Sequence, residues 1–295
     1  MKTVAITGPT EMLGSMVYNV LKDKFRLILI CDDNEDLTLL EKTYGDTSKH
    51  KRVKVKFDDL YQDYLTGFPD KPVGINFQKM IAEIGPVDAF INCASVVKSN
   101  IAKDPIMTFF INSSLPHILS HHYKDKLIHV TTDCVFDGLT GAPYNEDSAH
   151  NPTDSYGLTR SLGEPTKQSL VLRTSTIGPE IQGFNLFIEW FRKQEGKTIK
   201  GFTNHFWNGI TTKQFGKICD KIISDRQNYP ATGLYHIFSN EITKFEMVKK
   251  FKEKYDTKVN IEAAKSSPID RRLATIKNLC AKLQIPSFDE MLAEL

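Results

Sequence analysis

The first 21 residues constrain the fold most, because they place a strand, a glycine turn and a helix directly one after another. Residues 2–7 are apolar enough for a buried strand, and residues 15–21 have helical spacing. Between them runs GPTEMLG, from Gly8 to Gly14. In a dinucleotide-binding unit the first glycine makes the tight turn, and the last lets the helix approach the sheet. The order of these elements therefore predicts the start of a doubly wound α/β fold.

Glu11 stands at the middle position of this turn, where a glycine would let the backbone reach a pyrophosphate. A side chain there crowds the phosphates, and its carboxylate repels them. The amino end of the helix still offers N–H groups and the positive end of the helix dipole. Glu11 also has a plainer explanation, since an acid in a first helical turn complements that dipole. We still expect a bound dinucleotide, because strand, turn, helix, strand and acid follow in order.

The acid in that order is Asp32, which follows the apolar strand at residues 25–31. It lies 18 residues after Gly14, near the place of an acid that binds the ribose. Together with Asp33, Glu35 and Asp36 it would repel a 2′-phosphate, which favours NAD slightly over NADP. The alternative is that these four acids form a solvated loop.

Strands and helices continue to alternate, which predicts an α/β domain with a parallel sheet. Further strands are expected at residues 52–57, 87–92, 127–130 and 170–173, and helices at 76–84, at 105–123 with a bend near Pro116, and from 156. Asp58, directly after one of these strands, is a further candidate for the cofactor site.

After residue 176 the pattern becomes irregular, with helices expected at 184–191, 213–223 and 245–255 and a strand at 233–238. We therefore expect a Rossmann-type NAD(P)-binding domain over residues 1–175, to which some later segments return. Residues 176–295 would form a smaller, partly interleaved substrate-binding lobe over the carboxyl edge of the sheet.

Composition narrows the class of protein. The 295 residues are 40% hydrophobic, which suffices for one large domain or one and a half. A net charge of +2 gives no electrostatic case for nucleic acid. No apolar run approaches 18 residues, so no membrane span is expected, and no leader pattern precedes the first strand. Five scattered cysteines fit a reducing compartment, hence a soluble, cytoplasmic protein. His121 and His122 lack companions at metal-binding spacing, so no metal site is expected.

The stretch from Val130 to Glu164 contains candidates for proton transfer. The strand at 127–130 ends in hydroxyls at Thr131 and Thr132. Tyr156 and Arg160 are four residues apart, so on a helix they share one face. A cation at that place would lower the pKa of the phenol from about 10 and make it a usable acid near neutral pH. Taken alone, such a pair is more often a packed tyrosine beside a solvated arginine, and the surrounding motifs are what favour the catalytic interpretation.

Several motifs in this order resemble one family. They are the glycine turn, INCAS from Ile91, INSSLPH from Ile111, TTDCVFDG from Thr131, YGLTRSLGE from Tyr156 and LRTSTIGPE from Leu172. The later FIEWFRKQEG, GFTNHFWNGITT and GLYHIFSNEITKFEM continue the likeness to about Arg272. Together they are similar to the extended short-chain dehydrogenase/reductases, and most of all to the dTDP-4-dehydrorhamnose reductase branch.

The resemblance implies roles for individual residues. Thr132 would hold the substrate carbonyl or hydroxyl, Tyr156 would donate or accept the proton, and Arg160 stands where the family has the lysine that binds the nicotinamide ribose. The residues implied at the cofactor are Gly8, Thr10, Met12, Leu13 and Gly14 at the pyrophosphate, and Cys93, Ala94 and Ser95 at the end of the fourth strand. Those implied at the substrate are Asp133, Val135, Trp207, Asn208 and Thr211.

The implied activity is NAD(P)H-dependent reduction of a 4-keto-6-deoxy sugar nucleotide in surface polysaccharide synthesis, by a protein that could be a homodimer. Glu11 and Arg160 depart from the family, which keeps open a catalytically lapsed nucleotide-binding regulatory or scaffold subunit. The regulatory subunit of methionine adenosyltransferase resembles the same branch. A sugar-nucleotide epimerase is a third possibility. Cys134 stands where related dehydratases have Glu, which argues against elimination; it is either a buried structural residue or an acid/base, as in GDP-fucose synthases.

Overall fold

The computed structural model describes residues 1–33, 37–67 and 74–295. Within them the chain forms a parallel sheet of seven strands in the order β11-β6-β5-β4-β1-β2-β3. Consecutive pairing runs outward in both directions from β1 and β4, as in a doubly wound sheet. The predicted fold class is therefore confirmed. The strands are β1 Thr3–Thr7, β2 Arg26–Asp32, β3 Lys51–Val55, β4 Ala89–Asn92, β5 Leu127–Thr131, β6 Leu170–Arg173 and β11 Gly233–His236.

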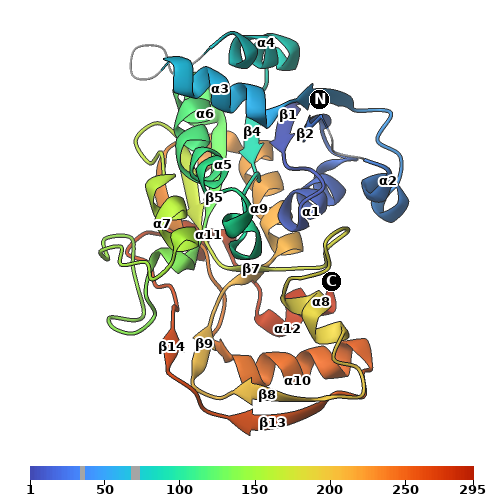
Figure 1. Cartoon of the computed structure of the whole chain (residues 1–295), viewed down its shortest axis with the longest axis vertical. Helices are drawn as coiled ribbons and strands as arrows, with labels where there is room; N and C mark the ends of the chain where they lie inside the picture. The colour runs from blue at the N-terminus through green and yellow to red at the C-terminus, as the bar shows by residue number, and fades with distance from the viewer. Residues whose placement is uncertain (34–36, 68–73) are drawn as a thin grey trace.

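Helices cover both faces of this sheet (Figure 1). One face packs against α1 (Met12–Leu21), α2 (Thr38–Tyr44), α9 (Thr212–Ser224) and α11 (Leu279–Leu283). The other packs against α3 (Phe57–Gly67), α4 (Ile75–Ile84), α5 (Pro105–Phe109) and α6 (Leu115–Tyr123). Because both faces are covered, strands such as β1 and β4 are buried along almost their whole length and are mainly apolar, without a polar face.

The helix expected over residues 105–123 contains a wide turn. Its regular parts, α5 and α6, are joined by the π-helical segment η2 (Phe110–Ser114). Pro116, in the first turn of α6, has no amide hydrogen for a regular helical bond. The predicted irregularity near Pro116 is thus present, and it lies in the turn that precedes the proline.

A smaller lobe lies beyond the carboxyl edge of the sheet (Figure 1). It has its own apolar core around Phe191, Phe251 and Phe288. The strand β8 pairs with β13, β9 pairs with β12 and β14, and β7 pairs with β10. Its elements are β7 Thr176–Ile177, α8 Phe187–Arg192, β8 Thr198–Phe202, β9 His205–Trp207, β10 Ile210–Thr211, β12 Ile242–Thr243, α10 Lys244–Tyr255, β13 Asn260–Ala264, β14 Ile269–Asp270 and α12 Phe288–Ala293.

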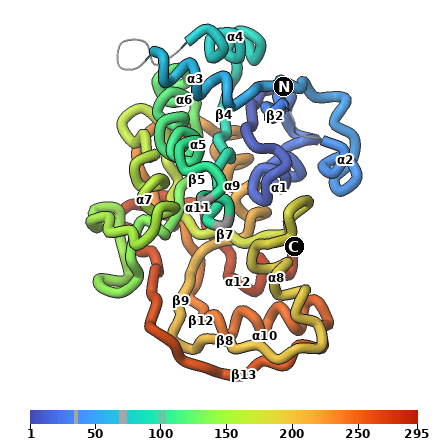
Figure 2. The backbone as a smooth tube through the Cα atoms, viewed as in Figure 1, coloured from blue at the N-terminus to red at the C-terminus, as the bar shows by residue number. Residues whose placement is uncertain are grey.

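The two lobes are interleaved along the chain. After entering the smaller lobe at β7, the chain returns to the sheet through α9, which packs against α1, and then adds the edge strand β11 (Figure 2). Several expected boundaries differ from the structure by one to three residues. The helix expected from 184 begins at Phe187, and the strand expected to 238 ends at His236. In the part of the chain that the structure describes, no helix combines the length and apolar character that crossing a membrane requires.

Candidate active site

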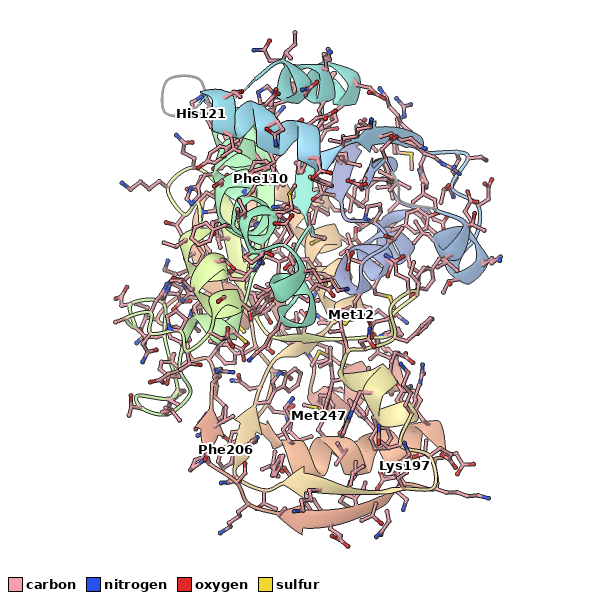
Figure 3. The ribbon with its side chains drawn as sticks, in the orientation of Figure 1. Met12, Phe110, His121, Lys197, Phe206 and Met247 are labelled. Carbon is pink, nitrogen blue, oxygen red and sulfur yellow. The ribbon has the colours of Figure 1, made fainter. Side chains whose placement is uncertain are left out.

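A cavity of about 350 Å³ lies where the carboxyl ends of the strands face the smaller lobe. This is the edge at which open α/β sheets bind their ligands. In Figure 3, Met12 lies at the edge of the sheet domain that faces the lobe carrying Met247. From the sheet side the lining includes Glu11, Met12, Leu13, Cys93, Ser95, Thr132, Asp133, Cys134, Tyr156 and Arg160. From the smaller lobe it includes Leu186, Phe187, Ile188, Trp207 and Lys244.

The glycine turn has the geometry that its sequence predicts. Gly8 adopts φ +63°, a conformation that favours glycine, and the Glu11 amide donates to its carbonyl at 3.2 Å. A Cβ on Gly14 would lie 1.9 Å from that same carbonyl oxygen, so only glycine permits this approach of α1 to the turn. Gly8, Gly14 and the buried Thr10 shape the turn from behind, while Met12 and Leu13 line the cavity itself.

Glu11 is the feature of the turn that does not fit a pyrophosphate. It precedes α1, lines the cavity and makes no capping hydrogen bond with its side chain. It keeps access to solvent, yet the surrounding protein raises the pKa of its carboxyl by desolvation, and the neighbouring Glu180 carboxylate raises it further. The carboxylate thus stands at the amino end of α1, where a dinucleotide phosphate would otherwise lie.

Of the acids predicted at the cofactor site, Asp32 ends a strand as expected and Asp58 does not. Asp32 closes β2, and its carboxylate accepts the Phe57 amide at 3.3 Å. Glu35 and Asp36 lie outside the described residues. Asp58 does not end a strand: it lies exposed in the first turn of α3, because the strand stops at Val55. The prediction that placed Asp58 at the strand's end was therefore wrong.

Helix α7 (Ser155–Leu162) carries the tyrosine and the arginine to the cavity. Asp154 caps it by accepting the Gly157 amide at 2.8 Å. A Cβ on Gly157 would lie 2.1 Å from the Cys134 carbonyl oxygen, so the helix rests directly on the segment that follows Thr132. This close contact brings the predicted catalytic residues Thr132, Tyr156 and Arg160 to one cavity.

Arg160 is only 3% exposed, and one nitrogen of its guanidinium is hydrogen-bonded to the protein. Its Nη2 donates to the Val130 carbonyl. Its Nε and Nη1 have no hydrogen-bond partner among the described residues. Buried N–H groups are almost always paired, so these two donors favour a bound ligand with oxygen acceptors. The alternative of a solvated arginine is wrong.

Tyr156 differs from the sequence prediction in the direction of its pKa. Burial raises the pKa of the phenol, and this outweighs the Arg160 guanidinium, which acts to lower it. The expected net lowering is therefore wrong for the protein without ligand. A phenol that stays protonated remains a competent proton donor, which is the role that a reduction requires.

Thr132, Asp133 and Cys134 form a further part of the cavity wall. The Thr132 hydroxyl accepts the Cys134 amide at 3.2 Å and donates to an Asp133 oxygen at 3.2 Å. Burial raises the pKa of the Asp133 carboxyl, while Arg271 and Lys244 act to lower it. Burial and the Asp133 carboxylate raise the pKa of the Cys134 thiol to about 12, which favours the structural alternative for Cys134.

Four further residues implied at the site do not line the cavity. Val135 is fully buried against Phe136, Tyr144 and Leu273. Asn208 exchanges two hydrogen bonds with the backbone of Leu273, and Thr211 caps α9 by accepting the Gln214 amide at 3.2 Å. Ala94 packs its backbone against Gly8. Their roles are structural, and the motif letters do not distinguish such neighbours from the lining residues Asp133, Trp207, Cys93 and Ser95.

Two lining residues stand within the quoted motifs but were not singled out as site residues. Phe187 comes from α8, and Lys244 is the first residue of α10. Only the packing of the smaller lobe brings them to the sheet edge.

Comparison with known proteins places these features in a family. A sequence model described as the RmlD substrate binding domain matches residues 76–278. The chain belongs to this family. Among curated relatives, methionine adenosyltransferase 2 subunit beta of Xenopus tropicalis is 25% identical over 257 residues, 82% of this chain and 69% of that protein. The dTDP-4-dehydrorhamnose reductase of Streptomyces griseus is 30% identical over 33% of each chain.

Solved structures agree with the fold of this RmlD-type chain. A dTDP-4-dehydrorhamnose reductase from Bacillus anthracis in complex with NADP has a TM-score of 0.68 at 18% identity, covering 99% of this chain and 97% of that one. A UDP-N-acetylglucosamine 4-epimerase from Methanobrevibacter ruminantium in complex with UDP-N-acetylmuramic acid has a TM-score of 0.71 at 16% identity, with 99% and 96% covered. The predicted family is confirmed, and the reductases among these relatives bear out the predicted class of function.

Proposed function

We propose that this protein is an NAD(P)H-dependent reductase of a 4-keto-6-deoxy sugar nucleotide. One observation carries the proposal: Thr132, Tyr156 and a buried Arg160, two of whose nitrogens have no partner among the described residues, line a single cavity at the carboxyl edge of the sheet. The family supports the same class of reaction. The setting would be nucleotide-sugar synthesis for surface polysaccharides, in the cytoplasm, where reduced nicotinamide cofactors are available.

Each residue has a definite task in this mechanism. When bound, a reduced nicotinamide would supply the hydride that the substrate carbonyl carbon accepts. Tyr156 gives its phenolic proton to the carbonyl oxygen, while the Thr132 hydroxyl orients that oxygen. The free Nε and Nη1 of Arg160 would hold ribose hydroxyls, and its charge stabilises the tyrosinate that remains. We favour NAD slightly over NADP, because Asp32 and Asp33 end the second strand with negative charge.

Replacing Tyr156 by Phe tests the mechanism. We expect turnover of a dTDP-4-keto-6-deoxyhexose to fall at least about a hundredfold, the usual scale for a general acid, with NADH and NADPH affinity retained. Oxidation of the reduced cofactor, followed by its absorbance, measures the rate. Unchanged turnover in the Tyr156→Phe protein would remove the mechanism. An epimerase would interconvert two sugar nucleotides without consuming cofactor, which product analysis detects.

A lapsed regulatory or scaffold subunit is the second candidate, and Glu11 in the cavity favours it. The long match to a subunit of methionine adenosyltransferase points in the same direction. Calorimetric titration with NADH and NADPH separates the two functions. If the natural protein binds neither cofactor and the Glu11→Gly, Arg160→Lys double variant binds one, the lapsed function holds. If the natural protein binds and turns over, the reductase holds.

A further inference from the structure

Lys244 is a cation in the cavity that the proposed mechanism does not use. It is the first residue of α10, and its Nζ lies 4.5 Å from the centre of the Phe187 ring and 5.6 Å from that of Trp207. Among the described residues, its Nζ makes one hydrogen-bond contact, with the Met247 sulfur at 3.8 Å, a weak acceptor. Within residues 1–33, 37–67 and 74–295, no carboxylate lies within 4.0 Å of this ammonium.

The position of Lys244 disfavours its charged form in two ways, through the helix dipole and through burial. A cation in a first helical turn faces the positive end of the helix dipole, and burial lowers the pKa of Lys244 to about 8. Asp133 and Cys134 are the groups that favour its charged form. Asp133 also faces Arg271, so the negative charge at this wall is shared between two cations. An anion that came close to Lys244 would therefore meet an ammonium whose charge Asp133 balances only in part.

The surroundings of Lys244 indicate where such an anion would belong. Its electrostatic partners Asp133 and Cys134 directly follow Thr132, which the proposed function assigns to the reacting carbonyl. The aromatic rings of Phe187 and Trp207 line the cavity beside it. An anion paired with Lys244 would therefore lie near the reacting carbonyl, on the side of the smaller lobe.

We propose that Lys244 determines substrate specificity by pairing its ammonium with a negatively charged oxygen of the sugar nucleotide. This inference rests on the proposed function, since it names the substrate class of the same cavity. Two groups could supply the oxygen: the diphosphate that links sugar and nucleoside, or a carboxylate in place of the methyl group of the 6-deoxy sugar. Both offer the charged acceptor that an ammonium prefers.

Binding measurements test this without requiring turnover. The natural protein, Lys244→Met and Lys249→Met are titrated calorimetrically with UDP, UDP-glucose, UDP-glucuronate, dTDP, dTDP-glucose and thymidine. Lys249 is the matched control, because it is an exposed lysine of the same helix whose Nζ lies 5.7 Å from the Phe245 ring. We expect Lys244→Met to weaken the binding of the charged probes by about ten- to a hundredfold, the scale of a hydrogen bond to a charged group. Lys249→Met should leave their affinities unchanged.

The pattern across probes identifies the group. An equal loss for the nucleoside diphosphates and both sugar nucleotides of one base assigns the pairing to the diphosphate. A loss of affinity confined to UDP-glucuronate assigns the pairing to a sugar carboxylate, in which case the substrate is not a 6-deoxy sugar. Lys244→Arg, which keeps the charge, should retain part of the affinity. If Lys244→Met binds every probe as the natural protein does, or if no charged probe binds the natural protein, the proposal fails. Retained NAD(P)H oxidation in that case would leave the reductase function standing.

Discussion

The two residues that depart from the family, Glu11 and Arg160, have opposite relations to the cavity. Arg160 is anchored at Val130 and lines the cavity, and among the described residues its Nε and Nη1 have no partner, which leaves them available for the role that we propose. Glu11 brings a carboxylate to the amino end of α1, beside Glu180. The charge at position 160 is thus adapted to its place, whereas the charge at position 11 opposes a bound phosphate.

This arrangement predicts that cofactor affinity depends on pH. The pKa of Glu11 is raised, so its carboxyl takes up a proton at a higher pH than the carboxyl of an ordinary glutamate does. Protonation removes the repulsion of the pyrophosphate, and the Glu180 carboxyl beside it, whose pKa is also raised, changes in the same direction. We expect NADH to bind several-fold more tightly at pH 5 than at pH 8, by calorimetry.

Glu11→Gln is the matched variant for this prediction. It should bind NADH at pH 8 about as tightly as the natural protein does at low pH, with a flatter pH profile. An equal pH dependence in the two proteins would show that Glu11 is not the group responsible.

The contact between α7 and the segment after Thr132 gives a prediction for a single element. Helix propensity alone favours alanine over glycine by about 1 kcal/mol, so Gly157→Ala would be expected to stabilise α7. The structure predicts the opposite, because the new Cβ would lie 2.1 Å from the Cys134 carbonyl oxygen. We expect a loss of about 1–3 kcal/mol in the free energy of unfolding, and a fall in kcat as Tyr156 shifts.

Leu158→Ala provides the comparison, since Leu158 is 46% exposed on the same helix. Denaturant unfolding of both variants measures the difference. A Gly157→Ala protein that unfolds at a higher denaturant concentration than the natural one would contradict the close contact.

Elements and their order could be predicted from the sequence better than the lining of the site. Strands β1 and β2 and the glycine turn are specified locally, by apolar runs and by Gly8 and Gly14, so the fold class followed from them. Val135, Asn208 and Thr211 were misplaced because motif position does not show which way a side chain points. Lys244 was missed for a different reason: its contacts with Phe187 and Trp207 join residues about 57 and 37 positions away in the chain. No local pattern encodes such contacts.

For the whole molecule, a buried charge network joins segments far apart in sequence. Arg173, in β6, forms two hydrogen bonds with Glu164, at 3.1 and 2.6 Å, and contacts His236 and His150. His236 belongs to β11, and its ring also contacts the Tyr144 and Ala274 carbonyls. Arg173 has no exposed surface, so each partner offsets part of the cost of burying its charge.

Removing one hydrogen-bond partner of Arg173 should therefore lower the stability of the fold. We expect Glu164→Gln to lower the free energy of unfolding by about 3–5 kcal/mol, because it leaves a buried guanidinium without its counter-charge. The same substitution at Glu294, whose ion pair with Lys217 is about 40% exposed on both sides, should cost less than about 1 kcal/mol. Urea unfolding of both variants measures the contrast. Similar losses at the two positions would show that burial of the network does not matter.

The return of α9 and β11 to the sheet has a consequence for synthesis on the ribosome. Residues 1–175 leave the exit tunnel without the helix that covers α1 and without the strand that pairs along the outer edge of β6. Translation proceeds at about 5–20 residues per second, so for several seconds the nascent chain presents an apolar face and an unpaired edge. The sheet domain cannot be completed before the rest of the polypeptide is made, and chaperones that shield nascent chains would meet it first.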